Sequence, residues 1–294
     1  MFQNEANHLP AMLDSLAHQT RPPDLLLLVD DGSTDRSAQI ARDAMPAFPE
    51  ARLLQRRPRP PARDRLSSAA VWTAFQWAVA QAGPDFDVVA KVDADLCLGP
   101  RILEDIATRF ERDHTLGITG PYLSELGDDG RLRRLEGRPE HVAGAVKFYR
   151  RECFDQVFPL PPLLNLDMVD EAKARSLRWR TESFTASDGD PLHARRQGSH
   201  DGSLRAYRRW GEGDYISGSH PLLVAFVGIR RLAERPLLLA GLNYFAGWAG
   251  AALRRADRFD REIRRFRQHE QLLRVRARLT QVITGRRRPP APMA

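Results

Sequence analysis

Two largely apolar runs in this chain each end abruptly in a pair of carboxylates. Residues 25–29 lead into Asp30-Asp31, and residues 88–92 lead into Asp93-Ala94-Asp95. A strand that ends in acidic residues presents them at the carboxyl edge of a sheet, where open α/β sheets bind their ligands. An Asp-x-Asp at that edge can hold a hard divalent cation, which can in turn hold a diphosphate. The two motifs therefore indicate an enzyme that handles a nucleotide-linked substrate.

Helix and strand signals alternate over the first 120 residues. Apolar periodicity, capping residues and Gly-Pro stops predict helices over 7–19, 33–45, 67–82 and 100–111. Short apolar runs between them predict strands at 24–29, 53–54 and 87–92. This alternation predicts an α/β fold, a Rossmann-like and mostly parallel sheet with helices on both faces.

The pattern changes in the rest of the chain. Strand-like pieces at 117–123, 141–149 and 179–184 lie among acidic and glycine-rich loops, and beyond Gly218 the chain becomes helical. We therefore expect a domain over 1–220, with a nucleotide-binding part (1–115) and an acceptor part (116–220). A helical, basic region follows over 221–294.

The charge distribution and the cysteine content bear on where this protein works in the cell. From Arg254 to the end there are 13 arginines and four acidic residues, which gives this segment a net charge of +9. The whole chain has a net charge of +7, so residues 1–253 carry −2. Only three of the 45 basic residues are lysines, which we interpret as an effect of coding-DNA composition. Two cysteines, Cys97 and Cys153, predict a reduced compartment without a disulfide framework.

Four motifs, taken in order, resemble the family 2 glycosyltransferases of GT-A fold. They are Asn4-Glu5-Ala6, Ser15-Leu16 with Gln19, the run from Val29 through Asp30-Asp31-Gly32-Ser33-Thr34-Asp35, and Asp93-Ala94-Asp95. A lone Asp-x-Asp is common, but the acidic run after an apolar strand is much more specific. The resemblance covers roughly residues 3–220 and implies the GT-A fold, with a further helical segment after it.

The resemblance implies a donor site for a nucleotide sugar. It assigns Glu5, Asp30, Asp31, Lys91 and Asp93 to the nucleotide sugar, and Asp95 with Asp93 to a divalent cation, Mg²⁺ or Mn²⁺. Residues i and i+2 of an extended segment point the same way, so both carboxylates can approach one ion. Plain turn chemistry and a Lys–acid pair are the alternatives for the first acidic run and for Lys91.

The family also supplies a general base some twelve residues before a tryptophan. Counting back from Trp179 places Asp167 at that position, with Asp170 as the alternative one helical turn on. The usual Glu before the base is Leu166 here, and the usual Gly before the tryptophan is Arg178. Helix N-terminal acids that satisfy the dipole are the structural alternative.

Three further residues receive roles through the resemblance. Gly144 fits a strand that lets a sugar lie close to backbone, or else a bulge. Arg195 and Arg196 resemble the basic loop that clamps the diphosphate, and a plain solvated loop is the alternative.

The start of the chain departs from the family pattern. Family members begin with an apolar strand before the Asn-Glu dipeptide, and here only Met1, Phe2 and Gln3 precede it. We expect either a start codon assigned too far downstream or a sheet left incomplete, with uncovered backbone groups.

The C-terminal region carries an uncharged stretch over 237–253 and a shorter apolar run over 222–229. A spanning helix needs about 20 apolar residues, so the longer stretch is borderline and the shorter run is insufficient. Together with the arginine-rich helix that follows, they predict monotopic attachment to an anionic membrane surface. A soluble helical cap is the alternative.

These observations predict an inverting, metal-dependent glycosyltransferase. It would move a sugar from a nucleotide-sugar donor to a hydroxyl of a sugar or lipid-linked acceptor, in cell-surface polysaccharide or glycolipid synthesis. We expect it in the bacterial cytoplasm, free or peripheral on the inner face of the cell membrane. The arginines are not regularly interleaved with aromatic residues, so no nucleic-acid partner is expected. An inactive membrane scaffold and a nucleotidyltransferase are the alternatives, and the sequence lacks the glycine-rich phosphate loop of the latter.

Overall fold

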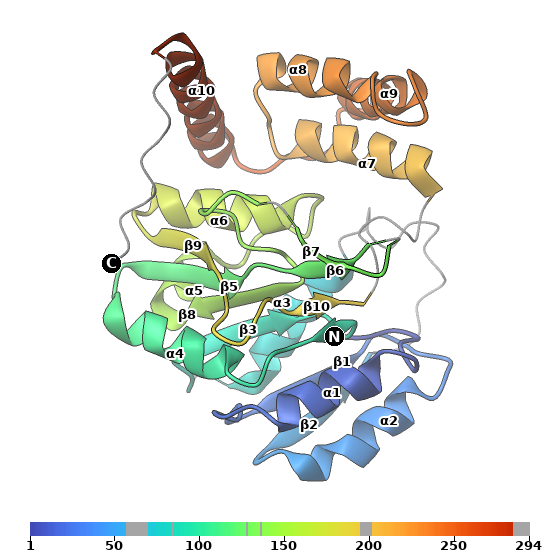
Figure 1. The fold of residues 1–294 in the computed structure, drawn as a ribbon, viewed down its shortest axis with the longest axis vertical. Helices are drawn as coiled ribbons and strands as arrows, with labels where there is room; N and C mark the ends of the chain where they lie inside the picture. The colour runs from blue at the N-terminus through green and yellow to red at the C-terminus, as the bar shows by residue number, and fades with distance from the viewer. Residues whose placement is uncertain (57–69, 84, 128, 136, 195–201, 285–294) are drawn as a thin grey trace. The chain divides into compact units, whose positions relative to one another are not determined.

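The structure is a computed structural model, and it describes all residues except 57–69, 84, 128, 136, 195–201 and 285–294 (Figure 1). The chain divides into two compact units, Met1–His200 and Asp201–Ala294, called here the N-terminal and C-terminal units.

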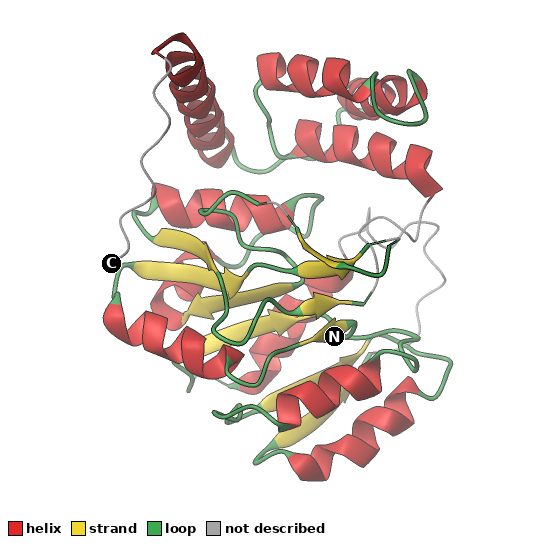
Figure 2. Cartoon of the chain, viewed as in Figure 1, coloured by secondary structure: helices red, strands yellow, loops and turns green. Residues whose placement is uncertain are grey.

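Helices and strands of the N-terminal unit follow one another much as the apolar pattern predicts (Figure 2). Its helices are α1 (Leu9–Ala17), α2 (Ser37–Ala44), the 3-10 turn η1 (Met45–Ala47), α3 (Ala70–Ala82), α4 (Ile102–Arg112), α5 (Arg151–Val157) and α6 (Leu166–Ser176). Its strands are β1 (Leu26–Asp30), β2 (Ala51–Gln55), β3 (Val88–Val92), β4 (Leu96–Cys97), β5 (Leu116–Pro121), β6 (Ser124–Leu126), β7 (Leu132–Arg134), β8 (Val146–Arg150), β9 (Arg180–Phe184) and β10 (Leu192–His193).

The described strands form three sheets. β1 and β2 pair in parallel, a second sheet has the order β3-β8-β5-β9, and a small third sheet has the order β4-β10-β6-β7. β5 and β9 are parallel, whereas β8 runs antiparallel to both of its neighbours. The α/β class predicted from the sequence is confirmed. The antiparallel strand could not be read from the β-α alternation, because β8 follows the point where that alternation ends.

Phe2 takes the place between β1 and β3 where the family pattern has its first strand. Its N–H donates to Val29 O (2.9 Å), and its carbonyl accepts from Asp31 N–H (2.9 Å). The amino group of Met1 donates to Val92 O at the end of β3 (3.3 Å). The Phe2 side chain is buried in the main core. Two residues thus join β1 to β3 at their carboxyl ends.

Helices cover both faces of the sheet that contains β8. Val146 and Phe148 belong to the apolar cluster that also contains the inner residues of α1 and α4. Tyr149 points to the other face, where its ring packs edge-on against Phe154 of α5 (5.8 Å between centroids) and near Phe75 of α3 (6.0 Å). This alternation along one strand separates an apolar layer from the layer that holds the polar groups described below.

The C-terminal unit consists of α7 (Gly202–Ile216), α8 (Pro221–Arg231), α9 (Leu239–Leu253) and α10 (Arg261–Thr284). α7 and α9 pack closely because Gly211 and Gly247 face the partner backbone, and a Cβ on either would lie 1.9 Å from a carbonyl oxygen. α10 is held by Gln271, whose Oε1 accepts from His220 N–H (2.7 Å). None of the helices in the described part of the chain is long and apolar enough to cross a membrane.

Candidate functional site

The first two motifs lie together although thirty residues separate them. Asn4 Oδ1 accepts from Thr34 N–H (2.8 Å), and Ser33 Oγ accepts from Asn4 N–H (3.0 Å). Glu5 N–H donates to Ser37 Oγ (2.8 Å) at the start of α2. The Asn-Glu dipeptide therefore fixes the loop that follows β1, and the Glu5 backbone is held at the start of α2.

Asp30 and Asp31 are both buried at the carboxyl end of β1. Asp30 accepts from Ser33 N–H (2.8 Å) and from Gln55 Nε2 of β2 (3.2 Å). Asp31 forms an ion pair with Arg56 (2.8 Å), and both side chains are less than a tenth exposed. Asp30 thus makes the turn contact that was the structural alternative for this motif, while Asp31 is a buried ion-pair partner.

Asp93 is tied through Lys91 to Gly144, in the turn before β8. The buried Lys91 ammonium donates to Asp93 Oδ1 (2.5 Å) and to the carbonyl of Gly144 (2.5 Å), and it lies 5.4 Å from the ring centre of Trp72. Asp93 itself is one-third exposed. The structure thus contains the Lys–acid pair that was the alternative role for Lys91. The same ammonium links the end of β3 to the loop before β8.

Asp95 lies beside a histidine that the sequence did not single out. His193 of β10 places Nε2 3.6 Å from Asp95 Oδ2 and Nδ1 3.3 Å from Glu125 Oε1. Asp95 O accepts from Ala194 N–H (2.9 Å), which fixes β10 next to the motif. No three His, Cys, Asp or Glu side chains of the described residues form a ready metal cluster. Of the two motif carboxylates, Asp93 is 33% exposed and Asp95 16% exposed.

Gly144 and Asp167 are in direct contact. A Cβ on Gly144 would lie 2.9 Å from Asp167 Oδ2, so only glycine leaves room for that carboxylate. The prediction of a strand over 141–149 is wrong in its first half, because β8 begins at Val146 and Gly144 lies in the turn before it. The reason is that Val142 N–H donates to the Glu171 side chain (2.8 Å) instead of to a neighbouring strand.

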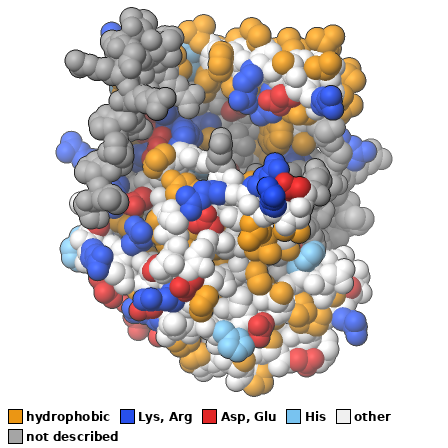
Figure 3. Space-filling model, in the orientation of Figure 1, with side chains coloured by type: hydrophobic (Ala, Val, Ile, Leu, Met, Phe, Trp, Pro, Cys, Tyr) orange, Lys and Arg blue, Asp and Glu red, His pale blue; other side chains and the backbone are white. Residues whose placement is uncertain are grey.

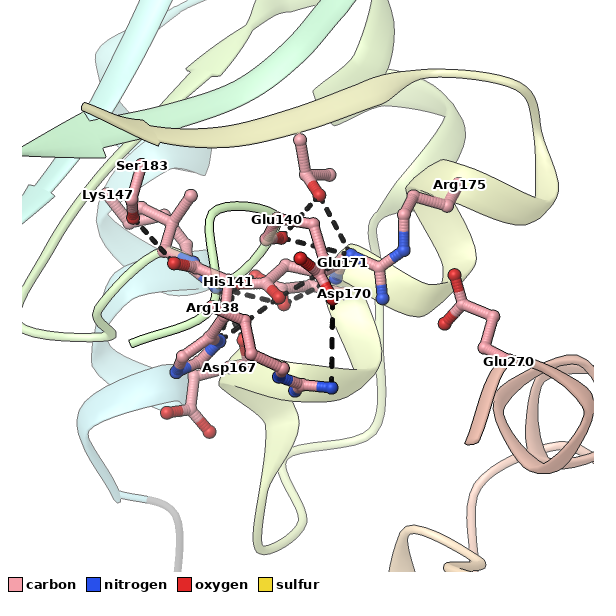
Figure 4. A network of polar contacts seen from close by, with 12 residues as sticks. Arg138, Glu140, His141, Lys147, Asp167, Asp170, Glu171, Arg175, Ser183 and Glu270 are labelled. Atoms are coloured by element: carbon pink, nitrogen blue, oxygen red, sulfur yellow. Dashed lines mark hydrogen bonds and ion pairs between the residues drawn. The ribbon is translucent and has the colours of Figure 1, made fainter. Parts of the chain in front are cut away.

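Asp170 belongs to a buried charge network that adjoins Asp167 (Figure 4). Lys147 of β8 donates to both oxygens of Asp170 (3.1 Å), lies 3.0 Å from Glu171 Oε1, and donates to the main-chain carbonyl of Asp167 (2.5 Å). Tyr149 donates its hydroxyl to Asp170 (2.6 Å). Asp170 and Lys147 have no exposed surface, whereas Asp167 is partly exposed.

The pKa of each charged group in this network is set by burial and by the charges of its neighbours. Burial raises the pKa of Asp170, and the attraction of Lys147 opposes that rise without cancelling it. Burial acts in the same direction on Glu171, but Lys147 and His141 outweigh it and hold the pKa of that carboxyl at about 2. The pKa of Lys147 is raised, because the pull of Asp170 and Glu171 exceeds the burial that would lower it. A charged Lys147 is thus built into the fold.

The structure brings most of the predicted site residues to two adjoining places. Glu5, Asp30 and Asp31 gather after β1, while Lys91, Asp93, Gly144 and Asp167 form a contiguous chain of contacts from β3 to α6. Arg195 and Arg196 lie outside the described residues. The sequence reading missed Lys147, Glu171 and His193. For Lys147 a signal was available in the sequence, because lysine occurs at only three positions of the chain.

Comparisons with known proteins agree with the geometry. The sequence model of the family described as "Glycosyl transferase family 2" matches residues 1–160. None of the curated proteins matches the chain.

Solved structures resemble the whole fold at low sequence identity. Staphylococcus aureus TarS 1–349 is 16% identical with a TM-score of 0.52, covering 87% of this chain and 70% of its own. The mannosyltransferase PcManGT from Pyrobaculum calidifontis, in complex with GDP-Man and Mn²⁺, is 18% identical with a TM-score of 0.52, covering 95% and 78%. GalNAc-T7 with UDP, GalNAc and Mn²⁺ is 13% identical with a TM-score of 0.54, covering 87% of this chain, which spans about half (53%) of that protein. At these identities the likeness shows the fold alone, and that fold is GT-A.

Proposed function

Because this chain belongs to glycosyl transferase family 2, we propose that it is an inverting enzyme that moves a sugar from a nucleoside diphosphate to an acceptor hydroxyl. One observation carries the proposal. The Asp-x-Asp motif and the candidate base Asp167 are joined by the contacts of Lys91 and Gly144, so donor and acceptor chemistry meet at one place. The division into a donor part (1–115) and an acceptor part (116–220) is part of this proposal.

On the donor side, buried carboxylates are suited to a nucleoside. Asp30 and Asp31 can accept hydrogen bonds from ribose hydroxyls or from the imino group of a pyrimidine. Glu5 lies at the same loop, since its N–H donates to Ser37. PcManGT with GDP-Man and GalNAc-T7 with UDP are neighbours whose bound nucleotides support a nucleotide donor. Arg195 and Arg196 are proposed to contact the diphosphate, as bidentate guanidinium donors.

The residues present fit a divalent cation, Mg²⁺ or Mn²⁺. Such an ion is usually bound by one or two carboxylates together with phosphate oxygens of the substrate, and Asp95 and Asp93 supply those carboxylates. His193 adds an imidazole nitrogen 3.6 Å from Asp95, a ligand type that suits first-row metals. When bound, the ion neutralises charge on the departing diphosphate. The Mn²⁺ in PcManGT and GalNAc-T7 supports this choice.

On the acceptor side, Asp167 is favoured over Asp170 as the general base. Asp167 takes the proton of the acceptor hydroxyl while the acceptor oxygen bonds to the anomeric carbon. The bond from that carbon to the diphosphate oxygen breaks on the opposite side, which inverts the configuration. Asp170 has no exposed surface and is already engaged by Lys147 and Tyr149, so it cannot meet a substrate. Gly144 leaves room for the Asp167 carboxylate, since a Cβ there would lie 2.9 Å from Asp167 Oδ2.

A donor screen followed by two matched variants tests the proposal. Thermal unfolding is measured with UDP and GDP sugars and Mn²⁺, because a ligand that binds only the native state raises stability, and diphosphate release is then followed. Asp167→Asn should lower turnover about 10²–10⁴-fold, the usual contribution of a general base, with donor binding retained. Asp170→Asn should lower the melting temperature instead. If Asp170→Asn lowered turnover and Asp167→Asn did not, the assignment of the general base to Asp167 would be wrong.

We further propose that the acceptor is a sugar or lipid-linked sugar, and that the protein works peripherally at the anionic inner face of the cell membrane. The support is an apolar surface on the C-terminal unit, called here the outer face (Figure 3). It consists of exposed Leu222, Phe226 and Ile229 of α8, Leu239, Leu242 and Leu253 of α9, and Leu237 and Leu238 between them.

The inner face of α9 is equally apolar, and its residues Ala240, Gly241, Tyr244, Gly247 and Ala251 are buried. A helix that is apolar all round needs a second apolar partner beyond its neighbours. Between residues 221 and 256 there are five arginines and one acidic residue, Glu234. This charge balance favours an anionic lipid surface, in which leucine and phenylalanine enter the acyl boundary and arginine meets the headgroups.

Sedimentation with phosphatidylglycerol vesicles tests the outer face. Leu242→Glu should release most of the protein from the vesicles, whereas Leu132→Glu should not, since Leu132 is also exposed (64% against 56%) but lies on β7 of the N-terminal unit. Binding should weaken in salt without vanishing, because the apolar part is not screened. Loss of a dimer on gel filtration in Leu242→Glu, with no vesicle binding by the parent protein, would assign the face to a second copy.

A further inference from the structure

Two of the only three lysines in this arginine-rich chain stand directly opposite each other. Lys91 of β3 and Lys147 of β8 are cross-strand partners in the antiparallel register. Both are buried, at 3% and 0% exposure. Like charges placed opposite each other on a sheet repel, so this arrangement needs strong compensation. Asp93 compensates Lys91, and Asp170 with Glu171 compensates Lys147.

Each ammonium also donates to one main-chain carbonyl. Lys91 donates to Gly144 O (2.5 Å), and Lys147 donates to Asp167 O (2.5 Å). Gly144 and Asp167 are the two residues in contact across the acceptor side. We infer that Lys91 and Lys147 form a cross-strand lysine clamp that positions the Asp167 carboxylate against Gly144. This inference rests on the role proposed above for Asp167.

The chemistry of lysine explains why arginine is absent from these two positions. An ammonium is a compact charge with three donors on a flexible stem, whereas a guanidinium is planar and wide. Lys147 uses its donors on a carbonyl and two carboxylates within a fully enclosed space. Glu171, held by Lys147, accepts from Val142 N–H and thereby fixes the loop that carries Gly144. The clamp therefore sets both partners of the contact.

Loss of the clamp should lower turnover per folded molecule, whereas loss of a purely stabilising ion network should lower stability alone. A displacement of about 1 Å in a reacting group can lower turnover about 10²-fold. Lys147→Met alone takes the ion-pair partner from the fully buried Asp170 and weakens the hold on Glu171, and it is expected to unfold the protein. The informative variant is Lys147→Met combined with Asp170→Asn and Glu171→Gln, which removes the lysine and neutralises its partners at nearly constant volume.

Lys173→Met is the matched control. Lys173 also lies on α6, and its ammonium donates to Val157 O (2.6 Å), at the far end of the helix from Asp167. In the triple variant, turnover per folded molecule should fall at least 10-fold, while stabilisation by UDP or GDP with Mn²⁺ stays unchanged. Lys173→Met should lower the melting temperature without changing turnover. A triple variant that keeps full turnover per folded molecule would overturn the clamp.

Hydrogen exchange supplies a readout that needs no donor sugar. Amides of Met168 and Val169, whose N–H groups donate to Asn165 O (3.0 and 3.2 Å), should exchange faster in the triple variant than in Lys173→Met. Equal protection in the two variants would also overturn the clamp. If every donor in the screen fails while exchange rises as expected, the positioning holds and the assigned reaction is wrong.

Discussion

Arg178 stands in the left-handed backbone region, and its replacement by glycine should stabilise the N-terminal unit. Its φ is +70°. Trp179 N–H donates to Ala174 O (3.0 Å) and Arg178 N–H to Arg175 O (3.0 Å), the paired bonds of a Schellman end to α6. Position 178 of such an end normally holds glycine, which is also what the family pattern has there.

The expected gain follows from two opposing terms. A left-handed conformation costs an L-residue about 1–2 kcal/mol, which Arg178→Gly removes. Glycine makes the unfolded chain more flexible, at about 0.4–1 kcal/mol. At the middle of both ranges the net gain is about 0.8 kcal/mol. For a unit of this size 1 kcal/mol corresponds to about 2–4 °C, so the melting temperature should rise by about 1–4 °C.

Thermal unfolding followed by tryptophan fluorescence measures this gain. Asn tolerates the left-handed region, so Arg178→Asn should fall between the parent and Arg178→Gly. Leu177→Gly is the control, because Leu177 precedes it with an ordinary φ of −89° and should lose stability. If Arg178→Gly melts at or below the parent temperature, backbone strain at this position does not govern the end of α6.

Three other changes have equally definite outcomes. Asp95→Asn should abolish the Mn²⁺-dependent part of thermal stabilisation by UDP or GDP, since it removes a charged ligand at constant volume; full stabilisation in chelator would refute the metal assignment. Gly144→Ala places a Cβ 2.9 Å from Asp167 Oδ2 and should lower diphosphate release about 10-fold or more with donor binding kept. Phe2→Ala should lower the free energy of unfolding by about 3–5 kcal/mol in a urea titration, because Phe2 is buried in the core; an unchanged midpoint would show that β1 is held by other contacts.

Local sequence signals predicted the elements that carry the donor carboxylates. The apolar runs before Asp30 and Asp93 became β1 and β3, because short aliphatic runs rich in leucine and valine favour strands through their own composition. The helix stop at Gly83 is confirmed for the same reason, and the helix predicted from residue 100 begins two residues later, at Ile102. These features depend on neighbours in the chain, which is what periodicity and capping describe.

The acceptor side depended on contacts between distant residues, and the sequence alone could not supply them. The Lys147 side chain meets Asp170 through the fold, so its role is invisible to spacing. His193 reaches Asp95 because β10 pairs with β4, a pairing across almost a hundred residues. We interpreted the scarcity of lysine as a coding effect. That interpretation stays a prediction, while the contacts of all three lysines inside the N-terminal unit show what each of them does there.

The short bridge at Phe2 has a consequence for cooperativity. Among the described strands, β1 and β2 share no ladder with the sheet that contains β3, and residues 1–2 supply the strand-to-strand hydrogen bonds between them. Asp31 and Asp93, the carboxylates of the proposed donor site, thus follow strands of two different sheets, which can open separately with different hydrogen-exchange protection. A nucleotide that touches Asp31 and Asp93 at once would act as a brace between them, so its binding should slow exchange in β1 more than in β8.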